Sequence, residues 1–121
     1  MSHKDWRVRI EDILEAIGRI ARYTHGLSER DFCADDRSVD AVVCNLQIIG
    51  EAANRLPVEV QRAHPHIPWN RMAEMRHILI HEYHSVNAGL IWATIHHDIP
   101  PLASPLRAML REPDPEPAEP A

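Results

Sequence analysis

The chain has 121 residues, a formal net charge of −5 and two cysteines. This length suits one domain with a sizeable hydrophobic core, and two cysteines without a CxxC spacing argue against a disulfide framework or a zinc finger. Because residues 112–121 hold four acids and no base, the rest of the chain, with 13 basic and 14 acidic side chains, is nearly neutral, unlike proteins that coat nucleic acid nonspecifically.

Apolar residues recur with the period of an α-helix through most of the chain, and strand-like alternation is scarce. The first predicted helix spans residues 4–24 and stops before Gly26, a residue suited to a helix C-terminus. The polar linker LSERDFCADD follows, and the second helix is capped by Asp35 or Asp36 and ended by Pro57. The residues expected to face the core are Ile10, Ile13, Leu14, Ile17 and Ile20 in the first helix, and Val39, Val42, Val43, Leu46, Ile49 and Ala53 in the second.

Prolines divide the middle of the chain into shorter helices. One helix fits between Pro57 and Pro65, because proline is tolerated at a first helical position but not inside a helix. The next helix opens at Pro68–Trp69 or at Asn70 and is expected to run to about residue 80 or 81 before it loosens. Its predicted buried residues are Met72, Met75 and Leu79.

The last helices and the tail complete the predicted fold. Asn87 can cap a helix that presents Ile91, Trp92 and Ile95 to the core, and Pro100 and Pro101 restart or kink it. Residues 112–121 alternate proline with acids and are expected to be disordered. The sequence therefore predicts an all-α domain over residues 1–111, built as an antiparallel four-helix bundle with short additional helices.

The chain shows no targeting or membrane segment in its sequence pattern. Its first residues lack the apolar core of a signal peptide, and no stretch approaches the roughly 18 apolar residues of a membrane span. We therefore expect a soluble cytoplasmic protein in which Cys33 and Cys44 are free thiols. Cys44 lies in mid-helix between apolar neighbours without a base nearby, which favours a buried, inert thiol over a nucleophile.

Three histidines in the segment RHILIHEYH could bind a metal ion. His77, His81 and His84 have the spacing i, i+4, i+7 and would share a face of a regular helix. Two imidazoles at i and i+4 can bind Zn²⁺, but Glu82 does not lie between them, where a zincin has its general base. With no further ligand nearby, metal binding is the weaker alternative, and we expect no metal and no cofactor.

The same segment contains the pattern R-x4-H-x-Y, formed by Arg76, His81 and Tyr83. An arginine can hold a phosphate and neutralise charge that develops on it, and a histidine can transfer a proton near neutral pH. Metal-free RNA cleavage needs both roles, because a base must activate the ribose 2′-hydroxyl and a cation must stabilise the charged phosphorus intermediate. Arg76 and His81 are therefore candidate catalytic residues.

A regular helix would not bring these two side chains together. At about 100° per residue, Arg76 and His81 would point roughly 140° apart. Either the helix must deform or end near His81, or the working site must combine groups from two subunits.

Four segments together resemble a known family, the HepT-type toxins among the HEPN (higher eukaryotes and prokaryotes nucleotide-binding) domain proteins. These segments are RIEDILEAIGRIARYT, DAVVCNLQIIGEAANRLP, HPHIPWNRMAEMRHILIHEY and IWATIHHDIPPLASPL. They occur in the family's order and spacing and cover most of residues 7–106. The resemblance implies an all-α homodimer in which two R-x4-H motifs meet at a cleft, and a metal-independent ribonuclease with Arg76 and His81 at the catalytic positions.

The resemblance also implies a partner. HepT-type toxins are neutralised by a small nucleotidyltransferase of the MNT type, which transfers AMP to the motif tyrosine, here Tyr83. The chain departs from the family pattern at two motif-adjacent positions, where His77 replaces a usual Asn or Asp and Glu82 replaces a common Gly. These residues could position the RNA substrate, but they also support an alternative, a non-catalytic dimeric partner that binds and regulates a nucleotidyltransferase.

Overall fold

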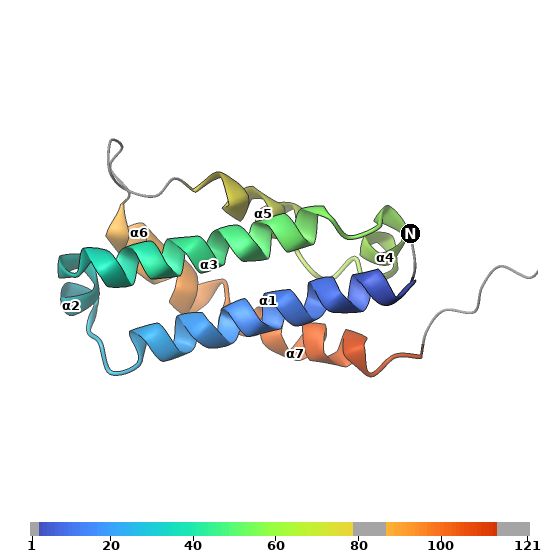
Figure 1. Cartoon of the computed structure of the whole chain (residues 1–121), viewed down its shortest axis with the longest axis horizontal. Helices are drawn as coiled ribbons and strands as arrows, with labels where there is room; N and C mark the ends of the chain where they lie inside the picture. The colour runs from blue at the N-terminus through green and yellow to red at the C-terminus, as the bar shows by residue number, and fades with distance from the viewer. Residues whose placement is uncertain (1–2, 79–86, 114–121) are drawn as a thin grey trace, which may run out of the picture.

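The computed structural model describes residues 3–78 and 87–113, and these residues form helices without any strand among them. The longest helices, α1 (His3–Thr24) and α3 (Asp36–Asn54), lie side by side and antiparallel (Figure 1). Behind them lie α6 (Ala88–His97) and α7 (Pro100–Leu110), with α7 packed on α1 (Figure 1). The predicted all-α class is therefore confirmed.

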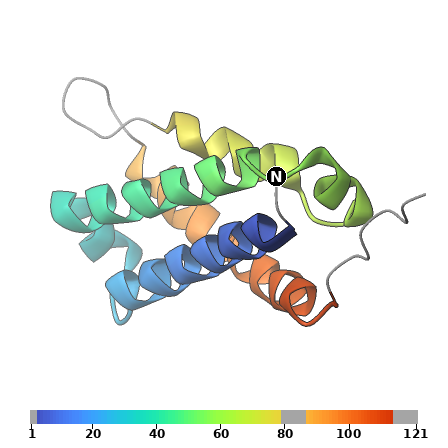
Figure 2. The ribbon, with the colours of Figure 1, turned by 45° about the vertical axis from the view of Figure 1, so that its right-hand side comes forward.

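Short helices cover the ends and one side of this pair. The helices α2 (Glu29–Ala34) and α4 (Val58–Ala63) follow α1 and α3 respectively. The helix α5 (Trp69–Glu74) continues into the 3₁₀-helix η1 (Met75–His77), and both pack on α3 on the side opposite α1 (Figure 2). No helix in the described part of the chain is long and apolar enough to cross a membrane.

The core forms where the apolar stripes of the helices meet. All six residues that were predicted to face the core from the second helix are buried. In the first helix Ile10, Ile13 and Ile20 are buried, while Leu14 and Ile17 are partly buried against the core. The 3.6-residue period thus predicted the buried faces of α1 and α3 correctly.

Polar caps mark where two helices begin. The Asp35 carboxylate accepts a hydrogen bond from the Arg37 backbone N–H at 3.2 Å and caps α3. A hydrogen bond from the Ser38 hydroxyl lowers the pKa of Asp35, because it favours the charged carboxylate. Asn87 accepts from the Leu90 N–H at 3.0 Å and caps α6, as predicted.

Two predictions about the first half of the chain are wrong. The linker LSERDFCADD contains α2, because the Ser28 hydroxyl caps it and Phe32 anchors it in the core, fully buried. Cys44 is exposed rather than buried. It lies on the outer face of α3 near the exposed Ile48, so its apolar neighbours in the sequence do not indicate burial.

The prolines of the second half act largely as predicted. A short helix does lie between Pro57 and Pro65, although α3 already ends at Asn54, before Pro57. A new helix also starts at Pro100, after α6 has ended. Leu79, predicted to be buried, and residues 114–121 of the predicted tail lie outside the described residues.

Candidate functional site

Arg76, the first candidate catalytic residue, lies in the single 3₁₀ turn η1 at the end of α5. Ile78 then adopts φ −69° and ψ 121°, an extended conformation that ends the helical run. The prediction that this helix continues to residue 80 or 81 is therefore wrong. The helical run therefore ends at His77, and Ile78 is the first residue outside it, three residues before His81.

A glycine of α3 explains how closely η1 can approach. A Cβ atom at Gly50 would lie 2.3 Å from the backbone nitrogen of Arg76 and 3.0 Å from its Cα. Real Cβ atoms do not approach backbone atoms so closely, so only glycine permits this contact. The backbones of α3 and η1 therefore touch at Arg76.

A glutamine of α3 fixes the next residue. The Gln47 side-chain amide donates a hydrogen bond to the carbonyl oxygen of Ile78, which is the first residue after η1. That carbonyl accordingly has a partner on α3 although it has left the helical conformation. Gln47 and Gly50 are three residues apart and lie on the same face of α3.

The Arg76 guanidinium has a donor to spare. The side chain is half-buried, and its Nη1 atom is buried without a hydrogen-bond partner among the described residues. A buried charged donor without a partner costs free energy, so its presence in a folded protein calls for an explanation. An oxyanion such as an RNA phosphate is the ligand whose oxygens match a guanidinium best.

Of the other residues in and around the motif, the structure describes only His77. His77 is exposed at the end of η1, next to Arg76. His81, Glu82, Tyr83 and His84 lie outside the described residues, so their distances from Arg76 stay open. Within the described ranges no three histidine, cysteine or acidic side chains gather in a way that could hold a metal ion.

A groove of about 490 Å³ begins beside this segment. It lies between α5 and η1 on one side and α6 and α7 on the other, and Met75, Ile78 and Leu102 contribute apolar surface. Arg71 and Asp98 form an ion pair at 3.5 Å along its edge.

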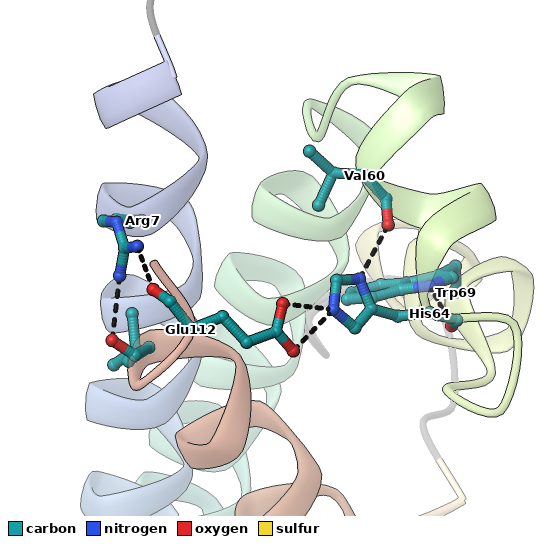
Figure 3. Close-up of polar contacts among 6 residues, drawn as sticks. Arg7, Val60, His64, Trp69 and Glu112 are labelled. Atoms are coloured by element: carbon teal, nitrogen blue, oxygen red, sulfur yellow. Dashed lines mark hydrogen bonds and ion pairs between the residues drawn. The ribbon is translucent and has the colours of Figure 1, made fainter. Parts of the chain in front are cut away.

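A separate polar cluster joins the turn after α4 to the segment just after α7 (Figure 3). The His64 imidazole has Nδ1 2.9 Å from the Val60 carbonyl oxygen and Nε2 3.0 Å from both carboxylate oxygens of Glu112. Burial lowers the pKa of His64, but these two acceptors outweigh it and raise the pKa above its ordinary value. Since both ring nitrogens face acceptors, the geometry fits a protonated imidazole.

Arg7 and Trp69 complete this cluster. The Arg7 guanidinium donates to the backbone carbonyls of Leu110, at 2.8 Å, and of Glu112 (Figure 3). The Trp69 indole N–H donates to the His64 carbonyl at 2.9 Å. Glu112, the first residue of the predicted tail, is thus attached to α1 and to the turn after α4. This cluster stabilises the fold, and its groups have partners of their own.

The sequence alone did not predict that Gln47 and Gly50 contact the segment around Arg76. One signal for Gly50 was present, because an isolated glycine within a strong helical pattern costs about 1 kcal/mol relative to alanine and often has a packing reason. No comparable signal existed for Gln47, since a glutamine in a helix is ordinary on any exposed face.

The chain is similar to proteins that are named as ribonucleases. The family model described as Ribonuclease HepT-like matches residues 13–109. A Thermococcus cleftensis protein named "Probable ribonuclease HepT" is 45% identical over 101 residues, which make up 84% of this chain and 89% of that protein. A "Putative RNase" of Caldanaerobacter subterraneus subsp. tengcongensis is 39% identical over 106 residues, 88% of this chain and 95% of its own length. No solved structure matches the chain.

Proposed function

This chain belongs to the HepT-like ribonuclease family, and on that premise we propose that it is a metal-independent endoribonuclease. The single observation that carries the proposal is the Nη1 atom of Arg76 in η1, which is buried and has no hydrogen-bond partner among the described residues. A guanidinium with an unused donor can bind a phosphate oxygen and stabilise charge that develops there.

In the proposed reaction His81 acts as the general base. It takes the proton of a ribose 2′-hydroxyl, and the 2′-oxygen then attacks the neighbouring phosphorus while Arg76 stabilises the added negative charge. The bond from phosphorus to the 5′-oxygen breaks, and a proton is returned to that oxygen. The products are a 2′,3′-cyclic phosphate and a 5′-hydroxyl, and no metal ion takes part.

We further propose that the protein works as a cytoplasmic homodimer and as the toxin of a bacterial toxin–antitoxin pair. Two R-x4-H motifs would meet at a cleft between subunits, with His77 and Glu82 beside the RNA. The antitoxin would be an MNT-type nucleotidyltransferase that transfers AMP to Tyr83. AMP at this position would add bulk and negative charge beside the phosphate site and so block RNA binding.

A second function is favoured by His77 and Glu82, the departures from the family pattern. Glu82 follows the candidate base His81 directly in the sequence, and a negative charge beside the phosphate site would oppose the binding of an RNA phosphate. In this alternative the chain is a non-catalytic dimer that binds and regulates a nucleotidyltransferase, with Tyr83 as its AMP acceptor.

The product of RNA cleavage tests the first function. Purified protein is incubated with RNA in the presence of EDTA, and the new ends are identified by mass spectrometry. We expect 2′,3′-cyclic phosphates, and we expect His81→Ala to abolish them while His25→Ala, which removes an exposed histidine just after α1, leaves the rate unchanged. Loss of wild-type activity in EDTA would contradict the mechanism.

Intact mass tests the regulation in both functions. After incubation with ATP and the nucleotidyltransferase, the wild-type chain should gain one or more AMP units. The chain has two tyrosines, so Tyr83→Phe and the matched control Tyr23→Phe identify the acceptor. A gain that survives Tyr83→Phe would refute the assignment of Tyr83.

A further inference from the structure

We propose that Gln47 and Gly50 of α3 are positioning residues that hold Arg76 in place for RNA cleavage, an inference that rests on the proposed function. Neither residue belongs to the R-x4-H-x-Y motif, and the two lie in a different helix from Arg76. They contact the chain at Arg76 and at Ile78, on either side of His77.

Gly50 determines how closely Arg76 approaches α3. The space that a side chain would occupy at position 50 is filled by the backbone nitrogen, Cα and Cβ of Arg76. These are backbone or backbone-attached atoms, so they cannot rotate away as the end of a flexible side chain could. Any residue larger than glycine must push η1 away from α3, and the guanidinium moves with it.

Gln47 holds the chain where it turns away from η1. Its side-chain amide donates to the carbonyl of Ile78, the residue whose extended conformation ends the helical run. Without this bond the carbonyl would lose its partner on α3, and a helical continuation could compete with the turn. Gln47 therefore favours the conformation that directs the chain away from η1 after Arg76.

Accurate placement matters because the buried Nη1 atom of the half-buried Arg76 has no hydrogen-bond partner among the described residues that would hold it. The position of the guanidinium therefore depends on its backbone and on packing. A misplacement of about 1 Å in a catalytic group can lower a rate on the order of a hundredfold.

The first test compares two Gly→Ala variants that make the same chemical change. In Gly50→Ala the new methyl group meets the Arg76 backbone, whereas in Gly18→Ala it meets only the Arg22 Nη1 atom at 3.7 Å, an ordinary contact. Both glycines lie within long helices, so the gain in helix propensity is matched. We expect kcat for RNA to fall about tenfold to a hundredfold in Gly50→Ala and to stay unchanged in Gly18→Ala.

The second test compares two glutamines that bond backbone carbonyls. Gln47→Glu removes the donor to Ile78, and Gln61→Glu removes the donors to Ala53 and Leu56. Only Gln47→Glu should lower kcat, by about threefold to tenfold with a smaller change in KM. This milder variant keeps the inference testable if circular dichroism shows that Gly50→Ala does not fold.

Two further readouts separate positioning from general stability. In an Arg76→Ala background, Gly50→Ala should have no further effect on the affinity for a 2′-O-methyl RNA that cannot be cleaved. Amide hydrogen exchange over residues 75–78 should be faster in Gly50→Ala and Gln47→Glu than in the wild type and the controls.

These measurements distinguish failure of the inference from failure of the proposed function. If the wild type cuts RNA but Gly50→Ala and Gln47→Glu cut it equally fast, the positioning role is wrong and the ribonuclease function stands. Unchanged hydrogen exchange over residues 75–78 in both variants would also overturn it. If the wild type cuts no RNA, the ribonuclease function fails, and with it the role in cleavage, even where hydrogen exchange supports the contacts.

Discussion

The Nε2 atom of His64 lies 3.0 Å from both carboxylate oxygens of Glu112, and this contact attaches the segment just after α7 to the turn after α4. The two residues are 48 positions apart in the sequence. On its other side the imidazole faces the Val60 carbonyl, so it is held between two acceptors. The contact has a consequence for the pH dependence of stability.

We expect the free energy of unfolding to fall as the pH rises above neutrality. The pKa of His64 is raised in the folded state, so its contribution is fully present below its unfolded value of about 6.5 and is lost as the pH rises through the folded pKa. For a partly exposed ion pair the loss should be about 0.5–1 kcal/mol. Urea denaturation between about pH 5 and 9 measures it.

His64→Gln should remove this pH-dependent step, because the glutamine does not titrate. His25→Gln is the matched control, since His25 is exposed at the end of α1 and should leave the step in place. An unchanged step in His64→Gln would show that another group is responsible.

Phe32→Ala should destabilise the protein by about 3–5 kcal/mol, because a fully buried aromatic side chain is removed and a cavity remains. The ring centroid of Phe32 lies 5.3 Å from that of Trp92, so tryptophan fluorescence should change as well. Urea denaturation checks the stability, with Val8→Ala at an exposed site as the control. A loss below about 1 kcal/mol would mean that α2 is not anchored in the core.

Both thiols should react with a disulfide reagent in the folded protein. Cys33 and Cys44 are free and exposed, so neither needs unfolding to react. Titration with Ellman's reagent without denaturant should count two thiols, and Cys44→Ser should remove one of them. If the thiol of Cys44 reacted only in urea, the prediction of a buried Cys44 would be correct after all.

Much of the fold could be predicted because the residues that a helix buries recur in the sequence with the helical period of 3.6 residues. The six apolar residues predicted to face the core between Val39 and Ala53 are buried, and Asn87 caps α6 as predicted. The helix α2 was missed because its evidence in the sequence is short: one capping serine and one buried aromatic, Phe32, in a run of polar residues. Cys44 was misplaced because its apolar neighbours belong to an adjacent face of the same helix.

The candidate site could be predicted only in part, because its geometry depends on contacts between helices. The sequence identifies Arg76 by its chemistry and by the spacing of the motif. It does not reveal that α3 meets the chain at Arg76 and Ile78, since Gly50 and Gln47 are about 30 residues away and no local pattern links them. The helix ends early, at His77, although Ile78 is not a helix-breaking residue. We attribute this end to the contacts with α3.

The rate of RNA cleavage by Arg76→Ala in the presence of EDTA tests the central claim most directly. We expect a loss of about a hundredfold to a thousandfold in kcat, the range for removal of a key charge-stabilising donor, with a partial recovery in Arg76→Lys. Arg107→Ala, which removes an exposed arginine of α7, should cleave at the wild-type rate. Wild-type cleavage by Arg76→Ala in EDTA would contradict the claim that Arg76 stabilises the reacting phosphate.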